Sequence, residues 1–310
     1  WTLSRGLGDV YKRQIQGTAG VTLAGLINAL KKTGGLLKDQ KIFFAGAGSA
    51  AIGLADLIVS ALAKEGISPE ISRNQIRMFD TKGIVTKNRQ NLENYKLPYA
   101  HDLQQSRSFD HTDLESEIPE LISAINDFKP NVLIGVSTVR KLFNQSVIEC
   151  MCSHNDKPII FALSNPTEKH ECLPEKAYEW SSKRAIYAGG VQFPPVHIDN
   201  QTFLPSQANN LYIFPAVGMA VYATKAKRVT DEMFIEAAHG VAEQVSQKQL
   251  ELGMLFPPQS NILEVEIKTA AKVAKLIFEK DLAGVSRPQD YEEFIRNHVF
   301  NAVYANIESE

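Results

Sequence analysis

The sequence predicts an α/β fold, a doubly wound parallel sheet followed by a helical extension, and three observations support this prediction. Short apolar runs typical of buried strands alternate with segments of helical periodicity. One of these runs leads directly into a glycine-rich turn and a helix. After about Pro205 the strand-like runs stop and helical segments follow. Because strands that alternate with helices are joined by right-handed crossovers, the sheet should be parallel.

The predicted elements follow one another without an internal repeat. The first helix contains apolar residues at helical spacing from Val21 to Leu30, and Gly34-Gly35 should end it. The predicted strands are residues 41–45, 74–80, 131–136, 158–163 and 185–188. The predicted helices between them are residues 50–63, 112–126 (opened by a capping box at Thr112 to Glu115) and 144–152, and a polar loop fills 64–74. The predicted extension contains helices over 215–227, 230–252, 261–280 and 288–297, with a break at Pro257-Pro258.

Composition and charge narrow the function. The 310 residues are 44% hydrophobic and 22% charged, which is typical of a globular chain. A net charge of −2 provides no field for nucleic acid or an anionic membrane, so we expect neither partner and favour a small-molecule ligand. The apolar stretch 42–63 is interrupted by glycines and Asp56, which favours a strand, turn and helix over a membrane span. Three cysteines fit a reducing, cytoplasmic compartment.

The segment KIFFAGAGSAAIG (41–53) is the strongest local signal. Gly46 permits a tight turn after the strand, and Gly48 has no Cβ to obstruct a pyrophosphate. Ser49 and Ala50 begin a helix whose free N–H groups would face that anion, and Ala51 fills the third small position. The pattern predicts a Rossmann-like dinucleotide site; an unliganded strand–helix turn is the alternative.

Charged residues after the second strand bear on the cofactor. Asp80 ends that strand, where a carboxylate would bind the adenosine ribose, although the spacing from Gly46 is longer than usual. Lys82 and Lys96 could pair with a 2′-phosphate. A solvated strand end and ordinary surface lysines remain the alternatives.

Two asparagine-bearing segments are candidate ligand sites. Asn165 follows the fourth strand at the edge where α/β proteins bind ligands, and Asn209 and Asn210 precede an apolar anchor. Amides can orient a carboxylate without adding charge, although turn chemistry also explains Asn in loops. Cys150, Cys152 and His154 lack tetrahedral metal spacing, so we interpret the thiols as buried helix residues.

Taken together, these segments resemble the carboxyl-terminal half of malic enzyme, the NAD(P)-dependent decarboxylating malate dehydrogenase. The resemblance is strong from Ile15 to about Pro258. It rests on IQGTA, FFAGAGSAAIGLADLI, MFDTKGIV, PYAHD, NVLIGVS, PIIFALSNPTEKHECLPEKAY, AIYAGG, QANNLYIFPAVGMAV and LGMLFPP, in that order.

The resemblance implies oxidative decarboxylation of (S)-malate to pyruvate and CO₂. In the family a Lys takes the hydroxyl proton, hydride passes to nicotinamide, Mg²⁺ or Mn²⁺ stabilises the enolate, and a Tyr protonates it. Asn165, Asn209 and Asn210 match the positions that hold malate. The matching cofactor positions are Gly46, Gly48, Ser49, Ala50, Ala51, Asp80, Val136, Ser137 and Asn165. Lys96 and the Asp80-Thr81-Lys82-Gly83 segment match NADP-preferring members, so NADP is expected over NAD.

The departures from the family are equally informative. The acid Tyr, base Lys and a Glu-Asp metal pair would lie upstream, and Arg13-Gln14 stands where the family has a metal-binding Asp-Asp pair, so no metal ligand is expected here. The family's Gly-Gln-Gly-Asn-Asn segment appears as Ser206-Gln207-Ala208-Asn209-Asn210, which could restrict the turn.

These departures lead us to interpret the chain as a fragment. We expect a leader at 1–14 that is a scar, a nucleotide-binding domain at 15–208, a helical segment at 209–282 that completes the catalytic domain in the family, and a tail at 283–310. The fragment alone should be inactive.

Two function classes remain open. One is a malic enzyme subunit that forms homo-oligomers, dimers or tetramers. The other is a non-catalytic dinucleotide-binding module with a sensing or scaffolding role, which the Arg13-Gln14 replacement favours. The sequence upstream of Ile15 would distinguish them.

Overall fold

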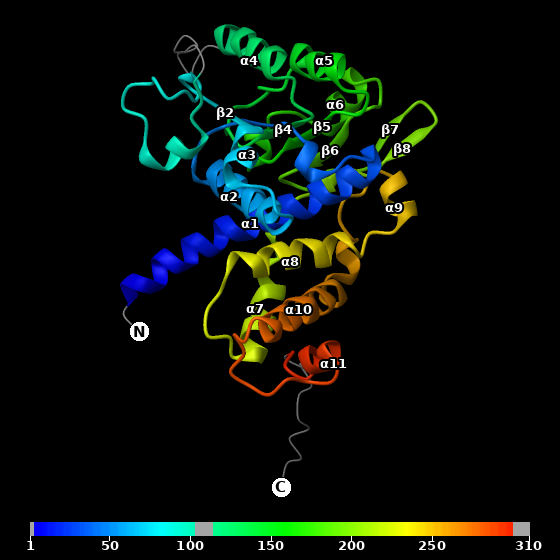
Figure 1. Ribbon diagram of the computed structural model, residues 1–310. Helices are drawn as coiled ribbons and strands as arrows, with labels where there is room; N and C mark the ends of the chain where they lie inside the picture. The colour runs from blue at the N-terminus through cyan, green and yellow to red at the C-terminus, as the bar shows by residue number, and fades with distance from the viewer. Residues whose placement is uncertain (1–2, 103–113, 300–310) are drawn as a thin grey trace.

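A mixed seven-stranded sheet forms the centre of the protein, seen in a computed structural model that describes residues 3–102 and 114–299 (Figure 1). The strand order is β3-β2-β1-β4-β5-β6-β9. The strands are β1 (Ile42–Ala45), β2 (Ile76–Asp80), β3 (Gly83–Ile84), β4 (Val132–Gly135), β5 (Ile159–Ala162), β6 (Ile186–Gly189) and β9 (Ser206–Gln207). Every pairing is parallel except that of β3 with β2. The predicted doubly wound α/β fold is therefore confirmed, with an antiparallel edge strand added.

Helices cover both faces of this sheet. The residues of β1, β4, β5 and β6 are all buried, as strands covered on both faces must be. On one face lie α4 (Leu114–Phe128), α5 (Gln145–His154) and α6 (Pro174–Trp180), which Figure 1 shows above the sheet. On the other face α1 (Leu3–Thr33) packs against α2 (Ser49–Lys64). α1 continues through residue 14 without interruption and ends at Thr33; Gly34 follows it with a φ of 73°, which suits glycine.

A second helical layer lies beyond α1 and α2. It comprises α7 (Phe214–Thr224), α8 (Asp231–Ala242), α9 (Gln247–Glu251), α10 (Ile262–Glu279) and α11 (Tyr291–Arg296). α10 packs against α7, α8 and α11, and α8 also packs on α1, so this layer shares the core of the sheet domain (Figure 1). Short 3₁₀ turns complete the chain at η1 (Leu37–Asp39), η2 (Asn94–Tyr99), η3 (Thr167–Lys169), η4 (Asn210–Tyr212) and η5 (Gln259–Asn261).

Three sequence-based expectations about the elements are wrong. Strands do not stop at Pro205, because β9 adds to the sheet beside β6. The expected helix over 230–252 is two helices, since Ser246 and Gln249 form a capping box that begins α9. The expected loop over 64–74 contains α3 (Pro69–Asn74), capped by Ser68. The capping box expected at Thr112 lies outside the described residues.

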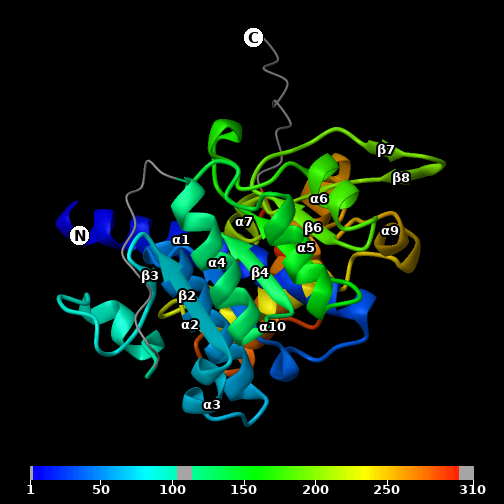
Figure 2. The same ribbon diagram turned by 90° about the horizontal axis from the view of Figure 1, so that it is seen from above.

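Strands β7 (Val196–Ile198) and β8 (Gln201–Phe203) form a separate antiparallel hairpin, which projects from the body in Figure 2. Asp199 in its turn has a φ of 51°, which Asp tolerates better than most residues. The hairpin directs the chain from β6 to β9, and β9 in turn leads to Asn209 and Asn210. No helix among the described residues has the length and apolarity needed to cross a membrane.

Candidate functional site

The glycine-rich turn between β1 and α2 has the geometry of a phosphate-binding turn. Gly46 adopts a φ of +120°, and a Cβ there would lie 2.6 Å from the carbonyl oxygen of Val136. Gly48 is the N-cap of α2, and a Cβ on it would meet nothing within 4 Å. Gly46 is therefore required by the fold itself, whereas the space beside Gly48 is open for a ligand.

The amino terminus of α2 faces that open space. Gly48, Ser49 and Ala50 are exposed, and no side chain caps the helix. The first intrahelical bond runs from the Ile52 N–H to the Gly48 oxygen, which leaves the N–H groups of the first turn available. Ala51 is buried where the helix meets the sheet. These features fit the pyrophosphate of a dinucleotide.

Asp80 is at the carboxyl end of β2, and two cations hold its carboxylate. Arg89 Nη1 lies 2.8 Å from Asp80 Oδ1, and Lys96 Nζ lies 2.9 Å from Oδ2. Burial alone would raise the pKa of Asp80, but hydrogen bonds from Lys96 and the Lys82 N–H, together with the charge of Arg89, keep it below its usual range. The Asp80 side chain is only 11% exposed, so it is not the solvated strand end that was the alternative.

Arg89 is one residue at this site that sequence reasoning missed. Its guanidinium also donates to the carbonyl oxygens of Lys82, Gly83 and Ile84, and its side chain is 3% exposed. Lys96 is buried and also pairs with Glu93, whereas Lys82 is exposed and contributes its backbone N–H. The signal for Arg89 was its position nine residues after a strand-end Asp, within a segment already rich in Lys.

Asn165, Asn209 and Asn210 lie around one cavity of about 360 Å³. Asn165 follows β5, Asn209 caps η4 by accepting the Leu211 N–H, and Asn210 begins η4. Thr18 and Thr22 of α1 also line the cavity, together with Gly190 and Gln207. A Cβ on Gly190 would lie 3.2 Å from Asn165 Oδ1 and 2.3 Å from the Leu163 oxygen. The fold thus brings Asn165 next to the consecutive Asn209 and Asn210, more than forty residues further along the chain.

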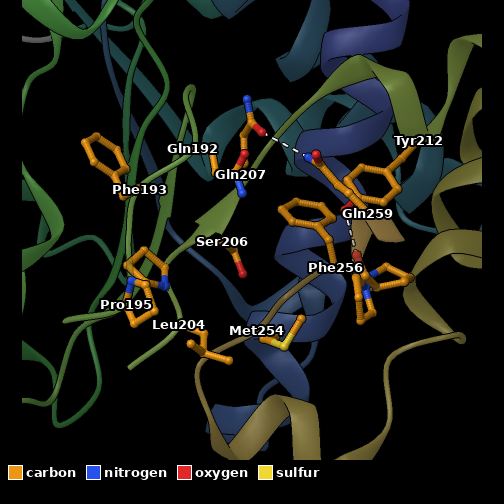
Figure 3. A pocket seen from close by; sticks show the side chains of 13 residues that line it. Gln192, Phe193, Pro195, Leu204, Ser206, Gln207, Tyr212, Met254, Phe256 and Gln259 are labelled. Atoms are coloured by element: carbon orange, nitrogen blue, oxygen red, sulfur yellow. Dashed lines mark hydrogen bonds between the residues drawn. The ribbon is translucent and has the colours of Figure 1, made fainter. Parts of the chain in front are cut away.

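A neighbouring cavity of about 280 Å³ shares Gln207 with this one (Figure 3). Gln259 Nε2 donates to Gln207 Oε1 at 3.0 Å, and the Tyr212 hydroxyl donates to the Pro257 oxygen at 2.6 Å. Ser206 Oγ accepts the Leu255 N–H at 2.6 Å, so the Ser that replaces the family's Gly anchors this segment. Gln207, which lines both cavities, is therefore held in place by Gln259.

Val136 and Ser137 follow β4, between the glycine turn and the loop that carries Asn165. Both are partly exposed, and the Ser137 N–H lies 3.1 Å from the Cβ position of Gly46. The Ser137 N–H and hydroxyl both donate to Glu171. Glu171 was not singled out by the sequence, because nothing in its immediate surroundings marks it.

Metal ligands are not assembled in the described part of the chain. No group of three or more His, Cys, Asp or Glu side chains there could hold an ion. Cys150 is buried and Cys152 partly buried, and burial raises the pKa of both thiols. Arg13 and Gln14 lie on α1, but their side chains are outside the described set.

The parallel sheet, the glycine turn and the acidic strand end together define a dinucleotide-binding α/β protein. Residues 15–278 match the family described as the malic enzyme NAD-binding domain. The chain belongs to the malic enzyme family and contains its NAD-binding domain.

Similar proteins support this assignment. The chain is 40% identical over 297 residues to an NADP-dependent malic enzyme of Vitis vinifera, covering 95% of this chain and 48% of that protein. It is 40% identical over 299 residues to the NADP-dependent malic enzyme of Homo sapiens, covering 96% and 50%. The structure resembles the malic enzyme of Entamoeba histolytica with a TM-score of 0.70 and 26% identity, over 91% of this chain and 52% of that one. The chain spans about half the length of the curated relatives it matches.

Proposed function

We propose that this chain is the cofactor-binding half of a malic enzyme that converts (S)-malate to pyruvate and CO₂ while reducing NADP. The observation that carries the proposal is the cavity lined by Asn165, Asn209 and Asn210. It lies at the carboxyl edge of the sheet that also carries the glycine turn, as expected for ligands of α/β proteins. The relatives named above as NADP-dependent malic enzymes support the same reaction.

The residues of this chain bind and orient the reactants. The α2 amino terminus holds the pyrophosphate, and Asn165, Asn209 and Asn210 orient the malate carboxylates and hydroxyl beside the nicotinamide. The dinucleotide supplies the hydride acceptor when bound. Because no carboxylate set for Mg²⁺ or Mn²⁺ is assembled in the described residues, we derive no step through the metal from this chain.

NADP is the proposed cofactor over NAD. A 2′-phosphate adds about two negative charges beside Asp80, and because Arg89 and Lys96 already neutralise that carboxylate, Asp80 would not repel the phosphate. Both cations are desolvated, which strengthens their attraction for a phosphate.

We also propose a cytoplasmic homo-oligomer, a dimer or tetramer, that binds neither nucleic acid nor membrane. The near-neutral charge supports the absence of a nucleic-acid partner. One relative at 40% identity is named as a chloroplastic enzyme, so fractionation of the source cells is the test of location.

A fusion tests the proposed activity. The chain from Ile15 onward is joined to the amino-terminal half of a malic enzyme, with Asp-Asp in place of Arg13-Gln14, and assayed with malate, Mn²⁺ and NADP⁺. We expect pyruvate and NADPH in equal amounts from the fusion and no turnover from the 310-residue chain. A folded fusion that binds dinucleotide without turnover would instead support the non-catalytic module.

A further inference from the structure

Glu171 is a fully buried carboxylate (0% exposed) that lies between the loops following β4 and β5. Its Oε1 accepts the Ser137 N–H at 3.0 Å, the Ser137 hydroxyl at 3.1 Å and the Ser164 hydroxyl at 2.5 Å. Its Oε2 accepts the Ser164 N–H at 3.3 Å. No described Lys, Arg or His forms an ion pair with it. Four hydrogen bonds from two serines are therefore what compensates this buried group.

Each of the two serine hydroxyls both donates and accepts a hydrogen bond. Ser137 Oγ accepts the Val139 N–H at 3.1 Å while it donates to Glu171. Ser164 Oγ accepts the Thr138 N–H at 2.9 Å while it donates to Glu171. The Ser164 hydroxyl thus bonds directly across from the β5 loop to the β4 loop. The network therefore links the two loops to each other and also shapes the β4 loop through the Val139 N–H.

The Glu171 side chain is packed closely against the end of β4. A Cβ on Gly135, at the end of β4, would lie 2.6 Å from Cδ of Glu171. The backbone of Glu171 is held as well, since its oxygen accepts the Phe143 N–H at 3.0 Å. Ser164 immediately precedes Asn165, and Ser137 immediately follows Val136, the residue against which Gly46 packs.

We propose that Glu171 is a positioning residue for the nicotinamide half of the cofactor. In this sheet β1 has β2 on one side and β4 and β5 on the other, so a dinucleotide crossing the β1 turn places adenosine over β2 and nicotinamide over the β4 and β5 loops. Glu171 fixes the distance between Ser137 and Asn165, the two loop residues that flank the nicotinamide. The inference rests on the proposed cofactor function and adds a residue that does not itself contact the cofactor.

The test separates the two halves of the ligand. Affinities of the chain for NADPH and for 2′-phospho-ADP-ribose, which lacks nicotinamide, are measured by calorimetry, and the emission of bound NADPH is recorded. We expect Glu171→Gln to weaken NADPH at least tenfold and to reduce its fluorescence enhancement, while 2′-phospho-ADP-ribose changes less than twofold. Ser164→Ala, which removes one donor and no charge, should act in the same direction with a smaller effect.

Glu266→Gln is the matched control, because Glu266 is another buried carboxylate, on α10. It should leave both ligands unaffected. Equal weakening of both ligands by Glu171→Gln and Ser164→Ala, or no weakening by either, would overturn the positioning role. If Glu171→Gln does not fold, the positioning role is tested with Ser164→Ala alone, by whether it weakens NADPH more than 2′-phospho-ADP-ribose. Failure of the unaltered chain to bind either ligand would refute the cofactor function itself.

Discussion

At the scale of single residues, the Asp80 carboxylate is neutralised by neighbouring cations of the chain itself. The carboxylate is balanced by Arg89 and Lys96, and the bonds to Asp80 and Glu93 raise the pKa of Lys96 although its burial lowers it. Asp80 therefore does not repel a second anion as a bare carboxylate would, because its charge is already matched.

Lys96→Gln should shift the preference from NADP toward NAD. One charge-assisted bond is worth roughly 1.5–3 kcal/mol, so the ratio of the two dissociation constants should move by about tenfold or more. Titrations of both cofactors by fluorescence check this. Lys87→Gln, which removes the same charge from an exposed pair with Asp102, should leave the ratio unchanged. An unaltered ratio in Lys96→Gln would refute the assignment.

Asn210→Ala should impair malate use in the fused enzyme. Losing a hydrogen bond to a charged substrate group costs roughly 1.5–3 kcal/mol, or about 10- to 150-fold in kcat/KM. Asn210 is a cleaner target than Asn209, whose side chain also caps η4. Steady-state kinetics are compared with Asn200→Ala, an exposed change in the β7–β8 turn. Unchanged malate kinetics would remove Asn210 from the site.

At the scale of elements, the two glycines of the β1–α2 turn have different roles: Gly46 is needed for folding and Gly48 for binding. Gly46 has a positive φ and packs against the Val136 carbonyl, whereas Gly48 has ordinary backbone angles and open space around it. One glycine is required by the chain itself and the other by a ligand.

Gly46→Ala should therefore affect stability, and Gly48→Ala should affect dinucleotide binding. Gly46→Ala should lower the free energy of unfolding by about 1–3 kcal/mol, from backbone strain and a clash with the Val136 carbonyl that follows β4. Gly48→Ala should keep the stability within about 0.5 kcal/mol and weaken dinucleotide binding by at least tenfold. Denaturant melts and cofactor titrations measure the two effects. A Gly48→Ala protein that binds normally would contradict the pyrophosphate assignment.

Only some of the helix boundaries could be predicted from the local sequence. The end of α1 before Gly34 and the start of α5 at the Asn144 cap were readable from sequence. The break between α8 and α9 was not predicted, because apolar periodicity continues through it and only the Ser246 cap marks it.

At the scale of the whole molecule, buried histidines link stability to pH. Burial, with Arg77 nearby, lowers the pKa of His101 to about 4, and burial also lowers the pKa of His170. Each therefore binds a proton more readily in the unfolded chain. Between about pH 6.5 and pH 4 the unfolded state holds more protons, so stability falls as the pH falls through this window.

His101→Gln should remove part of that dependence. Between pH 6.5 and pH 4 the free energy of unfolding of the variant should fall less than that of the unaltered chain, by up to about 3 kcal/mol. Urea unfolding at a series of pH values measures the difference. An identical slope in both proteins would show that His101 titrates normally.

The sequence by itself determined the local features: buried strands from continuous apolar runs, the glycine turn before α2, Asp80 at a strand end, and the family from its ordered motifs. These depend on residues close together in the chain. Which sequence-selected site residues act on ligand stays a prediction for the experiments above.

The tertiary structure alone decided which distant residues meet. β9 joins β6, and Glu171 binds Ser137 from 34 residues away. A two-residue strand has too little apolar pattern to be recognised before its partner is in place. A buried carboxylate resembles a surface Glu in sequence, because what compensates its charge is supplied by donors that only folding brings to it.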